Sequence, residues 1–208
     1  MNSRVVPIVA LLACAVMAAA CREKAPVASS TVIAGPAPDS FRVVFETSRG
    51  PFVVQVNRPW APKGVDRLYE LVQQGFFDDS RFFRVVPGFV VQFGLSADPK
   101  LNERWDKRIA DDSVSQSNLR GTLTFATQGP DTRSHQLFIN LADNPRLDAM
   151  GFSPIGRVVE GMNVVDSLYS GYGESPDQES IRTLGNAYLD RSFPKLDRIK
   201  TARVSAPE

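Results

Sequence analysis

Two dense apolar runs, separated only by Pro87-Gly88, constrain the fold of this chain more than any other feature of its sequence. The runs cover residues 82–86 and 89–93. Proline presets φ for a turn and glycine accepts positive φ, so a Pro-Gly pair between two apolar runs is typical of a tight bend. The pattern therefore predicts two short strands joined by this bend.

Further strands and two helices are predicted on both sides of this pair. Apolar and polar residues alternate around a turn in a first hairpin, and more strand-like segments follow later in the chain. The predicted strands lie at 41–47, 52–57, 122–127, 136–141, 154–159 and 196–204. Apolar residues recur at helical spacing over 65–72 and 162–169. Many short strands with two helices indicate a mainly β fold, a closed antiparallel barrel whose ends the helices cover.

Two polar stretches are predicted to be loops. Residues 96–118 have a weak pattern and form the first, a long surface loop of the kind that more often has a functional role than a stabilising one. Gly171-Tyr172-Gly173 follows the second helix and is expected to stop it, and a polar loop comes next.

Charge and residue usage exclude several classes of function. The 24 Lys and Arg nearly balance the 23 Asp and Glu, so we expect no large basic field and no nucleic-acid partner. His135 is the single histidine, and both cysteines lie in the first 21 residues. A Cys/His metal site therefore cannot form in the body of the chain, and we expect no metal there.

The N-terminus has the anatomy of a signal peptide. Arg4 precedes an uncharged, largely apolar run over residues 5–20. This run is shorter than the roughly 20 residues of a membrane span, so we expect cleavage. Small residues directly before Cys21 resemble the processing box of bacterial lipoproteins, in which the cysteine is acylated, although Ala18 stands where that box usually has Leu. Cys14 offers a rival box, and cleavage by an ordinary signal peptidase with a free Cys21 is the other alternative.

These features predict the domain organisation and the location. We expect a signal peptide at 1–20, a lipid-anchored flexible tether at 21–40 and a folded domain at 41–208. The lipid anchor would attach the domain to a membrane of the cell envelope, facing the periplasm. Arg22 after the cysteine favours the outer membrane over the inner one. A soluble periplasmic or secreted protein is the alternative.

Several sequence blocks resemble one protein family. Residues 81–92 read RFFRVVPGFVVQ, residues 75–79 read GFFDD, and both closely resemble the signature of cyclophilins. Further matches follow in the same order at 121–126, 129–132, 136–140, 147–148, 156–158 and 161–166. The end of the chain, with GYGE and FPKLD, resembles bacterial members of this family.

The resemblance implies a fold, an activity and a set of site residues. The fold would be an eight-stranded antiparallel barrel capped by two helices, and the activity peptidyl-prolyl cis-trans isomerisation. The resemblance assigns catalysis to Arg84 and Gln92. It assigns substrate binding to Phe89, Ala126, Thr127, Gln136, Phe138, Leu147 and Phe152. The partners would be proline-containing polypeptides, and we expect a monomer without a cofactor.

The sequence departs from the family pattern at three places. Phe83 precedes Arg84 where many members have His, and Arg146 precedes Leu147 where many have Trp or Phe. Residues 93–95 read FGL in place of the usual Gly-Gly-Asp. The first two changes are expected to weaken affinity for the cyclic peptide drug of the family. The third is expected to alter the geometry of the loop after Gln92.

The chemistry of an X-Pro bond explains why an arginine suits this role. Rotation breaks amide resonance against a barrier of about 18–20 kcal/mol. The prolyl nitrogen then becomes pyramidal and can accept a hydrogen bond, which the permanently charged guanidinium of Arg84 can donate without proton transfer. Phe89, Phe138 and Leu147 would hold the proline ring, while Gln92 and the backbone of Thr127 hold the flanking peptide. Gln136 would brace Arg84 or the peptide.

Other functions fit the sequence less closely. A cyclophilin-shaped peptide-binding or chaperone module with negligible catalysis is the first alternative, and a domain merely displayed on an anchor is another. His135 lies beside Ser134 and near Asp131, but no placed nucleophile supports a hydrolase.

Overall fold

The computed structural model describes Met1 and residues 35–205. The expected signal peptide, Cys14, Cys21 and the tether up to residue 34 lie outside the described residues. Within the described part, no helix is long and apolar enough to cross a membrane. At the end of the expected tether, Ala37 is buried and its backbone N–H donates to Asp66 Oδ1 at 2.9 Å.

The domain is built on one antiparallel sheet, in the order β3-β4-β6-β5-β7-β2-β1-β8. Its strands are β1 (Ser40–Thr47), β2 (Gly50–Asn57), β3 (Arg84–Val86), β4 (Val90–Phe93), β5 (Thr122–Phe125), β6 (Leu137–Asn140), β7 (Pro154–Glu160) and β8 (Ile199–Ser205). Every strand overlaps a segment that alternation or apolar density predicts, although β2 begins two residues earlier than expected, at Gly50. The mainly β, eight-stranded antiparallel architecture is therefore confirmed.

The expectation of a closed barrel is wrong, because the sheet is open between β3 and β8. In residues 35–205, the two edges are linked by a single isolated bridge, between Arg81 and Arg198, which lies just before both strands. Alongside β3 itself the edge is already occupied, since Val85 N donates to Gly173 O at 3.2 Å. The loop around residues 171–175 thus takes the hydrogen bond that a closing strand would need.

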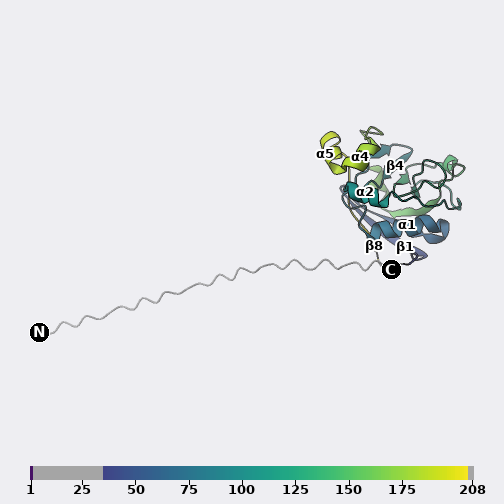
Figure 1. Cartoon of the computed structure of the whole chain (residues 1–208), viewed down its shortest axis with the longest axis horizontal. Helices are drawn as coiled ribbons and strands as arrows, with labels where there is room; N and C mark the ends of the chain where they lie inside the picture. Colours follow the sequence, from purple (N-terminus) through teal and green to yellow (C-terminus); the bar gives the residue numbers. More distant parts are fainter. Residues whose placement is uncertain (2–34, 206–208) are drawn as a thin grey trace. The chain divides into compact units, whose positions relative to one another are not determined.

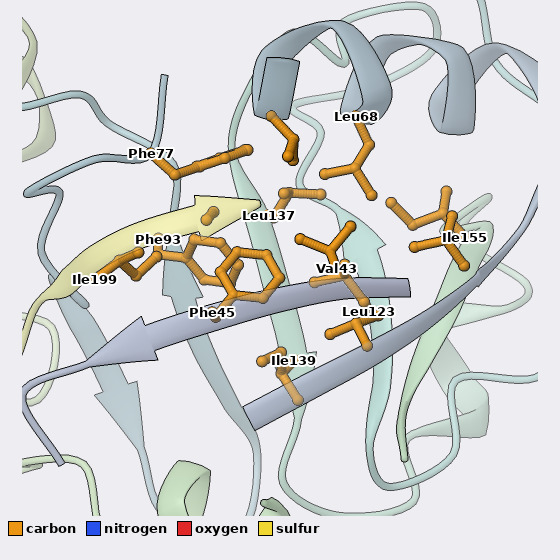
Figure 2. Close-up of a cluster of buried hydrophobic side chains, with 14 of the residues drawn as sticks. Val43, Phe45, Leu68, Phe77, Phe93, Leu123, Leu137, Ile139, Ile155 and Ile199 are labelled. Atoms are coloured by element: carbon orange, nitrogen blue, oxygen red, sulfur yellow. The ribbon is translucent and has the colours of Figure 1, made fainter. Parts of the chain in front are cut away.

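The main core lies on the inner face of the curled sheet. Figure 2 shows Leu68 of α1 (Pro62–Gln73) above the sheet residues Val43 and Leu137, with Phe45 and Phe93 beside them. Pro62 suits the first turn of α1, where its missing N–H leaves no partner unsatisfied. The inward residues are fully buried, and each buried Phe or Leu stabilises the fold by about 1.5–3 kcal/mol.

The described residues contain more α-helices than the two predicted. The predicted helices correspond to α1 and α3 (Met162–Asp166), and the structure adds α2 (Pro99–Trp105), α4 (Gln178–Leu184) and α5 (Asn186–Ser192). The segment 96–118, expected to be a long loop, therefore contains a helix. Its N-terminus is capped by Asp98, whose carboxylate accepts from Lys100 N at 2.9 Å.

A second small core fixes the C-terminal helices. It comprises Phe83, Leu95, Ile181 of α4 and Leu189 of α5, all nearly inaccessible to solvent. Figure 1 shows α4 and α5 together at one end of the domain, with α1, β1 and β8 toward the other. The helices thus pack beside β3 and β4, which explains why Phe83 is apolar.

Candidate active site

Strand register brings the predicted catalytic residues into one row across the outer face of the sheet. Arg84 on β3 pairs directly with Gln92 on β4, and Gln92 pairs with Phe138 on β6. Directly paired residues of antiparallel strands project from the same face. Their neighbours along β4 and β6, Phe93 and Leu137, point into the core instead. The period of two therefore separates the core from the candidate site.

A cavity of about 540 Å³ opens over this row. All the residues that the family resemblance assigns to catalysis or substrate binding line it. These are Arg84, Phe89, Gln92, Ala126, Thr127, Gln136, Phe138, Leu147 and Phe152. The structure thus brings together residues spread over much of the chain, while their individual roles stay predictions.

A chain of polar contacts orients Arg84 in this cavity. Its Nη1 donates to Gln92 Oε1 at 3.3 Å, and Gln92 Nε2 donates to Gln136 Oε1 at 2.8 Å. Gln136 therefore supports Arg84 through Gln92. The guanidinium also lies over the ring of Phe89, 5.6 Å from its centroid, and pairs with Glu174.

The apolar part of the cavity is a separate small cluster of side chains. Phe138 and Leu147 are each 5% exposed, and they pack with Val90. The ring of Phe138 meets that of Phe152 edge to face, at 5.6 Å between centroids. The remaining members are the half-buried Phe89 and Ala126. A compact apolar group such as a proline ring suits a pocket of this kind.

A buried polar network holds the walls of this pocket. Asn118 Nδ2 donates to Asp148 Oδ1 and to Phe152 O, both at 2.8 Å. Burial raises the pKa of Asp148, but hydrogen bonds from Ser117 and Asn118 outweigh it and hold the pKa below its usual range. Asn144 Nδ2 donates to Phe89 O at 3.1 Å. The network therefore fixes the segments that carry Phe89, Leu147 and Phe152.

Thr127 has hydrogen bonds of its own within the loop after β5. Its Oγ1 lies 2.7 Å from Thr132 Oγ1 and also donates to Gly129 O. Because the side chain is engaged in the loop, only the backbone of Thr127 could contact a peptide, and that role stays a prediction.

One wall of the cavity was not predicted. It includes Gln178, Glu179 and Arg182 of α4, together with Asp106 and Arg108 after α2. A side-chain hydrogen bond from Arg182 lowers the pKa of Glu179. The sequence did contain a local signal for the start of α4, since Asp177 is a typical N-cap residue. In the structure its carboxylate accepts from Ser180 N at 2.8 Å. The packing of α4 beside the site depends on Phe83, far away in the sequence.

Two of the segments that depart from the family pattern lie close to the site, at Arg146 and around the retained Gly94. The guanidinium of Arg146 lies 5.0 Å from the centroid of the Phe89 ring. Gly94 has φ +98°, and a Cβ there would lie 2.5 Å from His135 O. The chain after β4 thus passes close to the residue before Gln136, and only glycine fits at that point.

His135 is a buried structural residue at the edge of the cavity. Its Nδ1 lies 2.6 Å from Gly94 O, so Nδ1 carries the proton and donates. Its ring packs 5.2 Å from that of Phe76. Burial lowers the pKa of His135, which keeps the imidazole neutral. No group of at least three metal-ligating side chains occurs among the described residues.

This histidine makes stability depend on pH. Because its pKa is lower in the folded state, the unfolded state binds more protons, and stability is lost as pH falls below about 6.5. We expect the free energy of unfolding to drop, by at most about 1.4 kcal/mol per pH unit, as pH falls below about 6.5. His135→Asn should flatten this slope, measured by urea unfolding at each pH. Equal slopes for the variant and the parent would refute this role of His135 in the pH dependence of stability.

Comparisons with known proteins agree with this geometry. The family model described as cyclophilin type peptidyl-prolyl cis-trans isomerase/CLD matches residues 42–186. Peptidyl-prolyl cis-trans isomerase A of Dickeya dadantii is 37% identical over 137 residues, which cover 62% of this chain and 71% of the relative. Peptidyl-prolyl cis-trans isomerase B of Escherichia coli is 32% identical over 136 residues, which cover 61% of this chain and 82% of the relative.

A solved structure shares the fold. A cyclophilin-type peptidyl-prolyl cis-trans isomerase of Cryptosporidium parvum aligns over 81% of this chain and 99% of its own, with a TM-score of 0.59 and 19% identity. The fold and the outer-face site thus define a cyclophilin-like domain. The chain belongs to the cyclophilin-type peptidyl-prolyl cis-trans isomerase family.

Proposed function

We propose that this protein is a peptidyl-prolyl cis-trans isomerase acting on proline-containing polypeptides, without a covalent intermediate. The main observation is that Arg84 and Gln92 lie beside the Phe138 pocket within one cavity. Family membership and relatives named as isomerases give independent support.

Catalysis in this site requires selective binding of the twisted amide. Reaching millisecond turnover from an uncatalysed time of tens to hundreds of seconds requires roughly a 10⁴–10⁵-fold gain, or about 5.5–7 kcal/mol. The pocket around Phe138 would hold the proline ring, so that one side of the bond rotates against a fixed other side. Arg84 would donate to the pyramidal prolyl nitrogen, and Gln92 with Gln136 would hold the guanidinium in place.

A peptide-binding module without catalysis is the rival function. A protease-coupled assay on a short X-Pro peptide separates the two, because the module would bind the peptide without speeding its isomerisation. We expect acceleration that is proportional to protein concentration. Saturable binding with an unchanged isomerisation rate would favour the module, and absence of both would favour a domain merely displayed on its anchor.

We also propose that the protein is a bacterial lipoprotein, anchored through Cys21 in the outer membrane and assisting the folding of envelope proteins. The support is the sequence alone: the apolar run at 5–20, the small residues before Cys21 and Arg22 after it. Several acyl chains, each contributing about 0.8 kcal/mol per buried methylene, would give lasting attachment.

The anchor predicts a change in location for Cys21→Ser. The parent chain, expressed in a Gram-negative host, is expected to sediment with membranes, whereas the variant should move to the soluble periplasm or stay unprocessed. Cys14→Ser serves as the matched control and should keep the parent's location. A soluble parent whose N-terminal mass matches an unmodified Cys21 would contradict the anchor and leave the isomerase proposal intact.

A further inference from the structure

Glu174 lies next to Arg84 although 90 residues separate them in the sequence. Arg84 Nε donates to Glu174 Oε1 at 2.5 Å, and Nη2 contacts the same oxygen. The carboxylate thus binds the edge of the guanidinium formed by Nε and Nη2. Nη1, on the opposite side, donates to Gln92.

The loop that carries Glu174 is tied to β3 and to its own neighbours. Gly173 O accepts from Val85 N, directly after Arg84, at 3.2 Å. Gly173 has φ +54°, a left-handed conformation that favours glycine. The ring of Tyr172 packs edge to face against Tyr169 and Phe193, at 5.1 Å from each. The backbone therefore sets the position of Glu174 relative to Arg84.

This arrangement leaves donors of Arg84 available to a substrate. A guanidinium has five N–H groups. Glu174 takes the side-on pair and Gln92 takes one hydrogen on Nη1, so two of the five hydrogens remain, and the one on Nη2 lies on the end-on edge between Nη1 and Nη2. Two partners on different edges restrict rotation of the guanidinium plane. A fixed donor is more effective in a transition state than one that must be reoriented.

We propose that Glu174 is a positioning residue for the reaction, which holds the guanidinium of Arg84 with its end-on edge facing the substrate amide. This inference rests on the proposed isomerase function. Because the Glu174 side chain is 60% exposed, the pair is screened by solvent. The expected effect is accordingly moderate, about a fivefold loss of kcat with KM unchanged.

The test measures kcat and KM for isomerisation of a short X-Pro peptide by Glu174→Gln, Glu174→Ala and the control Glu160→Gln. Glu160 is a matched control, since its side chain is 62% exposed and it also pairs with an arginine, Arg42 Nη1 at 3.5 Å. Its partner Arg42 does not line the cavity, whereas Arg84, the partner of Glu174, does. We expect kcat to fall in both Glu174 variants and to match the parent in the control. The kcat of Glu174→Gln should lie between those of the parent and Glu174→Ala, because glutamine can still accept a hydrogen bond.

A double-mutant cycle and a spectrum separate positioning from a merely structural role. In an Arg84→Ala background, Glu174→Ala should cause no further loss of kcat. The Nε–H resonance of Arg84 in a ¹⁵N spectrum should shift in Glu174→Gln and stay in place in Glu160→Gln.

Three results would overturn the inference while the parent remains an active isomerase. The first is an unchanged kcat in both Glu174 variants, and the second is a kcat above that of the parent. The third is that Glu174→Ala lowers kcat by the same factor in the Arg84→Ala background as in the parent. A parent that does not accelerate isomerisation would instead overturn the proposed function. The two failures are therefore distinguishable.

Discussion

Arg84→Ala is expected to lower kcat/KM for X-Pro isomerisation by about 10²–10³-fold while the fold stays intact. This is the range for the loss of one preorganised donor to a transition state. Arg84 is partly exposed, and its ion pair with Glu174 contributes at most about 1 kcal/mol to stability. The loss should therefore appear in the rate of a coupled assay and leave the melting temperature nearly unchanged.

Two further variants sharpen this prediction. Arg84→Lys keeps the charge but loses the planar fork, so its rate should lie between those of the parent and Arg84→Ala. Arg120→Ala removes a comparable arginine, paired with Asp166 outside the cavity, and should match the parent. A folded Arg84→Ala protein with the parental rate would refute the proposed mechanism.

Phe138→Ala is expected to weaken both peptide binding and stability. The ring is 5% exposed and packs against Phe152 and Leu147, so its removal leaves a cavity that costs about 3–5 kcal/mol of unfolding free energy. The same cavity removes the pocket for the proline ring. We expect peptide affinity, measured by titration calorimetry on the fraction that is folded, to fall at least about tenfold.

A milder variant and an inner-face control keep this prediction testable where Phe138→Ala unfolds. Phe138→Leu should retain the fold and still lose affinity, because a branched aliphatic side chain alters the shape of the pocket wall. Phe125→Leu, on the inner face of the neighbouring strand β5, should lose stability but keep affinity. Parental affinity in Phe138→Leu and Phe138→Ala would remove Phe138 from the site.

The sheet could be predicted from the sequence because its signals are local. Alternation over 41–47 and the bend at Pro87-Gly88 are visible in short windows, and the strands begin and end near the predicted limits. Closure could not be predicted, because it depends on a competition for the edge of β3. Val85 N bonds to Gly173 O, and no local pattern records that contact.

The short helices and the far side of the site were missed for a related reason. The helices α4 and α5 are seven residues each, too short for a clear helical period, and their buried residues Ile181 and Leu189 pack against Phe83. The predicted lining residues came from the resemblance to cyclophilins. Glu174 and Arg182 were not predicted, because only the folding of distant segments brings them to the site.

Exchange NMR spectroscopy on a short X-Pro peptide tests the isomerase assignment most directly, since it observes binding and isomerisation in one sample. Without catalysis the cis and trans forms interconvert over tens to hundreds of seconds, too slowly to give exchange cross-peaks. We predict that a catalytic amount of the protein produces cis–trans cross-peaks and that Arg84→Ala largely abolishes them. Peptide resonances that shift on binding, with no cross-peaks for the parent protein, would contradict the isomerase function.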